Sequence, residues 1–118
     1  MIGGNTIATL QICSATRNAI GSTDKTWHDV IDLIGWIDLQ GGDSRYSYNA
    51  KMQESTHIFI GEYQAIPDTI SIDGKDIRVS AENARIVANS KRYDVKLIDD
   101  PMGLHRHLEI YLSYTGGQ

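Results

Sequence analysis

The stretch ARIVANSKRYDVKLIDDPMGLHRHLEIYLSY, residues 84–114, decides the fold. It contains three short runs of β-type composition, and two turn signals separate them. Asn89-Ser90 are small polar residues that tolerate tight turns. Asp100-Pro101-Met102-Gly103 has the composition of a type I turn, with proline in the second position and glycine in the fourth. The stretch therefore predicts a three-stranded antiparallel meander.

The second and third runs each alternate between apolar and polar residues, which is the pattern of a strand with one buried face. The predicted apolar face holds Tyr93, Val95, Leu97, Leu104, Leu108, Ile110, Leu112 and Tyr114. The predicted polar face of the last run holds His105, His107, Glu109, Tyr111 and Ser113. A sheet with one apolar face needs a second layer or closure on itself. The preceding part of the chain is expected to supply it.

That preceding part begins with alternation over Thr6–Cys13, which predicts a strand, and with a polar stretch over Ser14–Lys25, which predicts a loop. Thr26–Leu39 is ambiguous, because its apolar residues recur at helical spacing while several of them are β-branched. Periodicity alone permits both states. We favour a long strand kinked at Gly35, because glycine inside a strand often marks a bulge or a tight bend.

Gln40–Gln53 is polar and has no apolar stripe, so it predicts a long loop with at most one short helix. Thr56–Ile60 alternates again and predicts a strand. Within Asp68–Val79, Asp73-Gly74 between alternating runs is a strong hairpin signal. The chain is thus expected to be mainly β, a small antiparallel barrel or sandwich in a single domain, residues 1–118.

Composition narrows the class of protein. The net charge of -4 argues against a nucleic-acid binder, which would show a basic stripe. The lone cysteine, Cys13, excludes an internal disulfide. No apolar run has the length of a membrane span, and the first residues lack the pattern of a signal peptide. We therefore expect synthesis in the cytoplasm and no membrane contact.

A search for catalytic motifs finds no P-loop, no Gly-x-Gly-x-x-Gly, no Gly-x-Ser-x-Gly and no His-Glu-x-x-His. His105 and His107 share a strand face with Glu109, but a zinc site needs three or four convergent ligands. We interpret the two histidines as facing solvent. His28 with Asp29 and Asp32 is read as the polar side of an amphipathic segment, since acid–base catalysis needs a specific mutual geometry. No enzyme activity, no metal and no cofactor are predicted.

The long loop carries Arg45, Tyr46, Tyr48 and Lys51, which have the chemistry to stack on and neutralise single-stranded nucleic acid. A loop for protein contact is the preferred interpretation, because tyrosine and arginine are enriched where interfaces are anchored.

Several motifs resemble the head-closure proteins of siphophages and prophages of Gram-positive bacteria, also called head–tail connector, adaptor or stopper proteins. The motifs are Gly35–Leu39, Gly42–Tyr46, Tyr48–His57, Arg92–Val95, Asp99–Gly103, Leu108–Leu112 and the tail Gly116-Gly117. The resemblance covers nearly the whole chain. Asp68–Val79 is longer than the family pattern, which suggests an additional hairpin.

The resemblance implies a small antiparallel β-barrel in the virion neck, with Thr26–Leu39 as a strand. It implies a ring, commonly dodecameric, that closes the DNA-filled capsid below the portal and adaptor and offers the tail a docking surface. Such a protein would be made in the cytoplasm of the host bacterium and act without catalysis. We expect it to be largely monomeric alone and to let DNA pass without sequence-specific binding.

The resemblance also matches Gln40–Gln53 to the segment that faces the channel of stopper proteins and helps gate DNA exit. The residues to which this hypothesis assigns the role are Gly41, Gly42, Arg45, Tyr46, Tyr48 and Lys51. Two alternatives stand beside this interpretation. One is a tail terminator or minor tail protein, and the other is a small β-barrel that binds an oligonucleotide or ligand.

Overall fold

The computed structural model describes residues 6–17, 19–39 and 55–114. Eight strands are present in this part of the chain. They are β1 (Thr6–Arg17), β2 (Thr23–Leu39), β3 (His57–Glu62), β4 (Thr69–Ile72), β5 (Lys75–Arg78), β6 (Ala84–Ala88), β7 (Lys91–Asp99) and β8 (His107–Ser113). The described residues also contain two three-residue 3-10 turns, η2 (Ala81–Asn83) and η3 (Pro101–Gly103). The short helix that the sequence allowed over Gln40–Gln53 lies outside the described residues.

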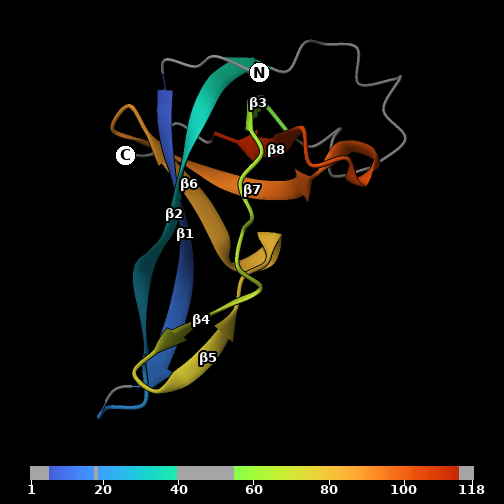
Figure 1. Ribbon diagram of the computed structural model, residues 1–118. Helices are drawn as coiled ribbons and strands as arrows, with labels where there is room; N and C mark the ends of the chain where they lie inside the picture. The colour runs from blue at the N-terminus through green and yellow to red at the C-terminus, as the bar shows by residue number, and fades with distance from the viewer. Residues whose placement is uncertain (1–5, 18, 40–54, 115–118) are drawn as a thin grey trace.

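Six strands form a closed antiparallel ring in the order β1-β2-β3-β8-β7-β6, and β4 and β5 form a separate two-stranded sheet (Figure 1). The predicted mainly β fold with barrel closure is therefore confirmed. Closure hides the apolar face of the meander β6-β7-β8 on the inside of the ring, as the alternation in residues 84–114 required. It also leaves fewer unpaired strand edges.

The interior of the ring is filled by side chains from all six of its strands. The fully buried large residues are Leu10, Ile12, Leu33, Phe59, Ile86, Ile110 and Leu112. The inward side chains of β7 are Tyr93 and Val95, as predicted, but Leu97 is not inward. A register shift between Val95 and Leu97 pairs Leu97 with the outward Tyr111. Because of this bulge, Ile98 packs against the core in its place.

The N-terminal hairpin is longer than predicted. The expected loop over Ser14–Lys25 is wrong, because β1 continues to Arg17 and β2 begins at Thr23, with the two strands paired throughout. β1 pairs with β6 only over Thr9–Ile12, so the distal part of the hairpin extends past the ring. Both faces of the hairpin contact solvent there. Because neither face needs apolar residues, the sequence of these strands does not alternate between apolar and polar residues.

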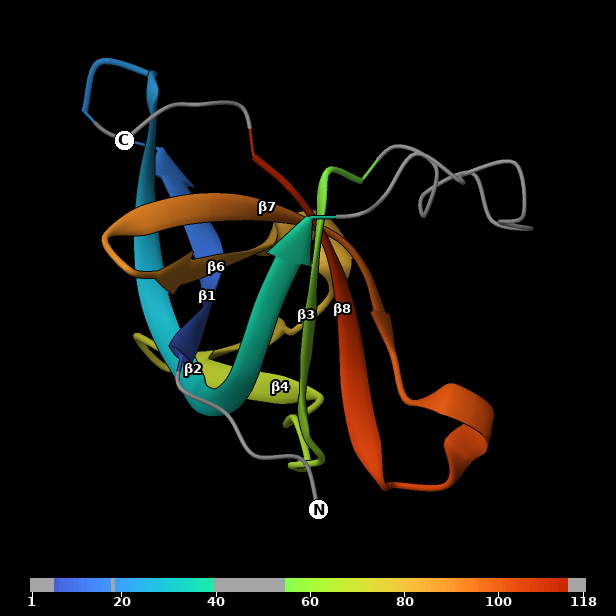
Figure 2. The same cartoon turned by 90° about the horizontal axis from the view of Figure 1, so that it is seen from above.

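The ambiguous segment 26–39 is a strand, as favoured, and Figure 2 shows its strong curvature. Its register shift lies at Val30, where Leu10 pairs with Ile31 and Gln11 with Asp29. Gly35, the residue at which we expect the kink, is the point where β2 passes from one partner strand to the other. It pairs with both β1 and β3, and a Cβ there would lie 2.2 Å from the Ile60 carbonyl oxygen.

The additional hairpin suggested over Asp68–Val79 is present as β4 and β5. Asp73 and Gly74 form its turn with φ values of 51° and 79°. Two successive residues with positive φ are the signature of a type I′ turn, which matches the twist of a two-residue hairpin. A backbone hydrogen bond from the Val79 N–H to the Asp68 carbonyl, 2.8 Å, closes the base of this hairpin.

Candidate functional site

The predicted gating residues, Gly41, Gly42, Arg45, Tyr46, Tyr48 and Lys51, lie outside the described residues. What the structure does place is the two strand ends that flank their segment. Leu39 at the end of β2 pairs with His57 at the start of β3. The Thr56 N–H also donates a 2.8 Å hydrogen bond to the Leu112 carbonyl. The segment therefore leaves and re-enters the ring at a single end.

Three aromatic rings meet at this same end. His57 lies 5.3 Å from Tyr93 and 6.0 Å from Tyr114, and the two tyrosine rings are 5.2 Å apart. The Tyr114 N–H donates to the Thr56 hydroxyl at 2.8 Å, which joins the last residue of the described chain to the residue that precedes β3. Burial, and then the neighbouring Tyr114, raise the pKa of Tyr93 above its ordinary value. The cluster packs this end of the barrel.

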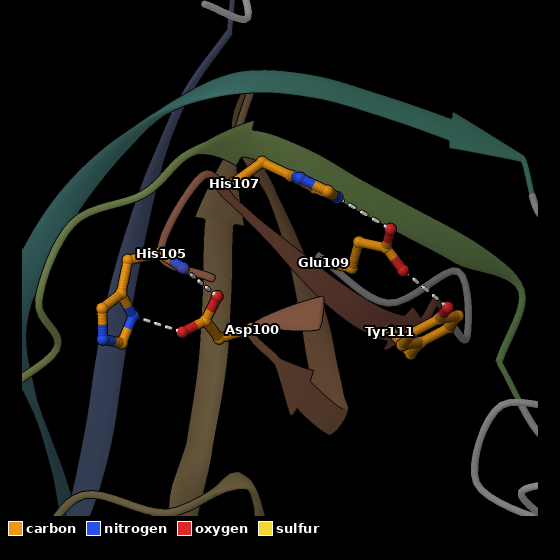
Figure 3. Close-up of polar contacts among 5 residues, drawn as sticks. All are labelled: Asp100, His105, His107, Glu109 and Tyr111. Carbon is orange, nitrogen blue, oxygen red and sulfur yellow. Dashed lines mark hydrogen bonds and ion pairs between the residues drawn. The ribbon is translucent and has the colours of Figure 1, made fainter. Parts of the chain in front are cut away.

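The polar face predicted for β8 is present only in part. His107 Nε2 is 3.0 Å from Glu109 Oε2, and the Tyr111 hydroxyl donates to Glu109 Oε1 at 3.0 Å (Figure 3). Burial, followed by the hydrogen bond to Glu109, raises the pKa of Tyr111 to about 12. Glu109 is thus held from both sides by neighbours on its own strand.

His105 does not join this face. It has a φ of 55° in the β7–β8 loop, and its ring Nδ1 contacts Asp100 Oδ2 at 2.5 Å (Figure 3). The His105 ring also lies 4.5 Å from the ring of Tyr63. In the described part of the chain no group of three or more histidine, cysteine, aspartate or glutamate side chains is placed to hold a metal ion. The two histidines therefore have separate partners.

The second set of polar residues, on β2, is also dispersed. Asp32 accepts a hydrogen bond from the Thr9 hydroxyl and Asp29 accepts one from the Gln11 amide, both 2.7 Å. His28 Nε2 is 2.8 Å from the hydroxyl oxygen of Ser14. The Asp32 and Asp29 contacts join directly paired residues of β1 and β2, and the His28 contact is diagonal, because His28 pairs with Ile12. The three residues act as cross-strand pairs of the hairpin, and they do not converge on one point.

A surface pocket of about 410 Å³ lies beside this hairpin, where the β6–β7 pairing ends. Its lining residues are Trp27, Ala81, Glu82, Ala84, Asp94, Val95 and Lys96. The Arg85 guanidinium stands 4.0 Å over the Trp27 ring, and its Nε donates to Gln11 Oε1 at 2.8 Å. Burial is the main cause that lowers the pKa of Arg85 from its ordinary value. The pocket mixes an aromatic wall with charges of both signs.

The sequence reasoning missed an exposed apolar area on the outside of the ring. Ile7 is 61% exposed and pairs with Ile34, which is 46% exposed. Trp36 is 45% exposed and pairs with Ile60 on β3. We call Ile7, Ile34 and Trp36 the outer apolar face. Its signal in the sequence is two pairs of adjacent apolar residues, Leu33-Ile34 and Trp36-Ile37, which make both faces of β2 apolar.

Exposed apolar side chains also occupy the β7–β8 loop. Met102 is 91% exposed and Leu104 is 53% exposed, so the prediction that Leu104 belongs to the apolar inner face is wrong. The reason is that β8 begins only at His107, after the loop has turned through residues with positive φ.

Within the described residues, no helix has the length and apolar character needed to cross a membrane.

Comparison with known proteins supports the fold alone. No family model and no curated protein matches the chain. Among solved structures, the solution structure of protein SF1141 from Shigella flexneri 2a is similar, with a TM-score of 0.63 and 17% sequence identity. The match covers 98% of this chain and 96% of that chain. The two proteins therefore share this small β architecture along nearly the whole length of both chains.

Proposed function

We propose that this chain is a structural assembly protein of the phage neck. It acts as a ring subunit that closes the DNA-filled capsid below the portal and adaptor, and it provides the surface to which the tail docks. The observation that carries the proposal is the outer apolar face, which lies on the outside of the closed six-stranded barrel of one subunit. A contiguous exposed apolar patch on a small folded domain marks an interaction surface. The resemblance of Gly35–Leu39, Arg92–Val95, Asp99–Gly103 and Leu108–Leu112 to head-closure proteins indicates which assembly this surface would serve.

The closed six-stranded barrel of a single subunit suits a mechanical role. Its interior is filled by side chains that are almost fully buried, such as Phe59 and Ile110. A packed interior resists deformation, so contacts on the outside can be held in constant relative positions. Many weak contacts repeated around a closed assembly add up to a stable ring, while each isolated subunit stays soluble. We expect light scattering to show a largely monomeric purified protein; a stable ring formed by the protein alone would contradict this.

Deletion of the gene from the phage or prophage that carries it tests the proposal. Heads should package DNA, fail to accept tails and lose their DNA on purification, because nothing closes the portal. Complementation with the full chain should restore tailed particles. Tailed, infectious particles in the deletion strain would overturn the proposal. Full heads bearing complete neck complexes, together with tails of uncontrolled length, would indicate the tail-terminator alternative.

Gating by the loop is a separate part of the proposal. The paired ends Leu39 and His57 anchor the 40–54 segment at one end of the ring, which suits a segment that acts in a channel. Removing Arg45–Ala50 should leave a folded, assembling protein whose capsids leak DNA. Restoring the same length with a glycine–serine linker separates side-chain chemistry from loop length. Capsids that stay sealed in both variants would exclude a gating role.

The second alternative, a barrel that binds an oligonucleotide or small ligand, has one observation in its favour. The pocket beside Trp27 has a volume within the range of ligand sites and carries an aromatic wall next to Lys96. Titration with single-stranded DNA at low and moderate salt tests it, because genuine binding through phosphates weakens steeply as salt rises. Binding that disappears in Trp27→Ala would favour this alternative over the neck protein.

A further inference from the structure

The β7–β8 loop is a projection whose turn is held by internal hydrogen bonds. The Asp100 carboxylate accepts the His105 N–H at 3.0 Å and also contacts the His105 ring. The Gly103 N–H donates a hydrogen bond to the Asp100 carbonyl, and the Leu104 N–H donates one to the Pro101 carbonyl. These two backbone bonds close the turn inside the loop. Figure 2 shows the loop projecting from the ring on the side away from the tip of the β1–β2 hairpin. The loop thus has a defined shape before it meets any partner.

The tip of this projection is apolar with basic neighbours. Met102 and Leu104 are exposed at 91% and 53%, and His105 and Arg106 beside them are exposed as well. Two large apolar side chains that stay exposed on an ordered turn do not stabilise the folded monomer, because apolar surface contributes to stability only when it is removed from water. We call Met102 and Leu104 the loop knob. Its chemistry fits an apolar surface with acidic residues at the edge.

The outer apolar face has that chemistry. On β2, alternate residues point outward, and the outward series runs Asp32, Ile34, Trp36, Asp38. The apolar centre is therefore flanked by a carboxylate on each side along the strand, and both carboxylates are exposed. In the same molecule, β3 and β8 separate this part of β2 from the loop. The two complementary surfaces are consequently presented on different parts of one subunit.

We infer that the loop knob of one copy docks on the outer apolar face of a second copy, with Arg106 near Asp38. This inference rests on the proposed function, because it specifies the contact between ring subunits. A contact between two different surfaces of identical chains is heterologous, and repetition of such a contact closes into a ring when the rotation between copies permits. Apolar burial supplies attraction, and the opposite charges fix orientation and register.

Cysteine trapping detects the contact even when it is weak. In a Cys13→Ser background, one sample carries Met102→Cys and another carries Ile34→Cys. The two are mixed at high concentration, oxidised and analysed by non-reducing electrophoresis with distinguishable tags. The matched control replaces Met102→Cys by Ile20→Cys, which sits on another turn and is 85% exposed. We expect about tenfold more heterodimer from the knob mixture than from the control mixture, equivalent to about 1.4 kcal/mol of preference.

Charge reversal then tests the orientation. Arg106→Glu in the Met102→Cys partner should reduce the heterodimer yield several-fold, and Asp38→Lys in the Ile34→Cys partner should restore it. A role of either residue in its own folding would not be repaired by a change in the other chain. Equal yields in the knob and control mixtures, or loss without rescue in the charge-reversed pair, would overturn the inference.

The trapping experiment and the gene deletion separate the two proposals. A knob-specific cross-link in a protein whose deletion leaves tailed phage would support self-assembly and reject the neck role. Absence of the cross-link in a protein needed for head closure would reject this contact and retain the function.

Discussion

The closed ring and the β4–β5 hairpin are both antiparallel sheets, yet they are stabilised in different ways. The ring has an inside, and residues such as Leu10 and Phe59 are fully removed from water there. The hairpin has only one covered side, on which Ile70 and Ile77 face each other and are half-buried. The ring therefore depends on packing, whereas the hairpin depends on the geometry of its turn. Each dependence predicts a different response to substitution.

The largest effect is expected from the ring interior. Phe59→Ala removes a fully buried ring whose Cζ lies close to the glycines that join β2 and β3. The loss should be about 4 kcal/mol of unfolding free energy, the usual cost of emptying such a site. Urea denaturation measures it. Ile77→Ala in the hairpin is the control and should cost much less, because its side chain is already half-exposed; equal losses would contradict the comparison.

The next effect concerns the join between β2 and β3. Gly35→Ala places a methyl group 2.2 Å from the Ile60 carbonyl oxygen and 2.6 Å from the Gly61 Cα. Both contacts are to backbone, so the strands must separate, and we expect a loss of about 3 kcal/mol. Gly21→Ala on the β1–β2 turn meets nothing within 4 Å, so it is the control without a close contact, and it should cost only about 1 kcal/mol of backbone strain at its φ of 85°. A Gly35→Ala protein as stable as the Gly21→Ala protein would disprove the close approach.

A smaller, local effect is expected in the hairpin. Gly74 has a φ of 79° with open space around its Cα, so Gly74→Ala costs backbone strain and no packing. The expected cost is about 1 kcal/mol, typical of a left-handed residue that carries a Cβ. Hydrogen exchange should show faster exchange of the β4 and β5 amides with unchanged protection in β6 and β7. Uniform loss of protection would mean that the hairpin and the ring unfold as one unit.

The smallest effect is expected at Tyr111, which points away from the barrel interior but is only 8% exposed. Tyr111→Phe removes the hydrogen bond to Glu109 and should cost roughly 0.5–1 kcal/mol at neutral pH. Because the pKa of Tyr111 is raised from 10 to about 12 by folding, the unfolded chain loses this proton first as pH rises. The wild-type protein should therefore lose stability between pH 10 and about 12 more steeply than Tyr111→Phe. Parallel stability curves for the two proteins would disprove the shift.

Parts of this architecture follow directly from local sequence. Alternation identified the inner face of β8 from Leu108 to Leu112, and the turn residues Asp73-Gly74 identified the β4–β5 hairpin. The errors arose where a local rule met a non-local cause. Leu97 was placed inside because alternation cannot reveal the bulge before it, which depends on how β7 pairs with β8. Ser14–Lys25 was placed in a loop because a strand exposed on both faces shows no alternation.

The candidate surfaces were harder still. His105, His107 and Glu109 have the spacing of one strand face, but the loop turns His105 away to Asp100. The outer apolar face combines residues from β1 and β2 that are distant in sequence. The apolar character of both sides of β2 was visible, but which side would stay exposed was not. That choice depends on the ring as a whole.

The sequence by itself determined that the chain forms short antiparallel strands with a hydrophobic side, because side-chain alternation and turn chemistry act over a few residues. Only the tertiary structure decided how the strands close, with β1 beside β6 and β2 bent from β1 to β3. It also decided that Ile34 and Trp36 face outward while Leu33 is buried. The physical reason is that register and closure are set by packing between strands far apart in the chain, and no local pattern encodes that packing.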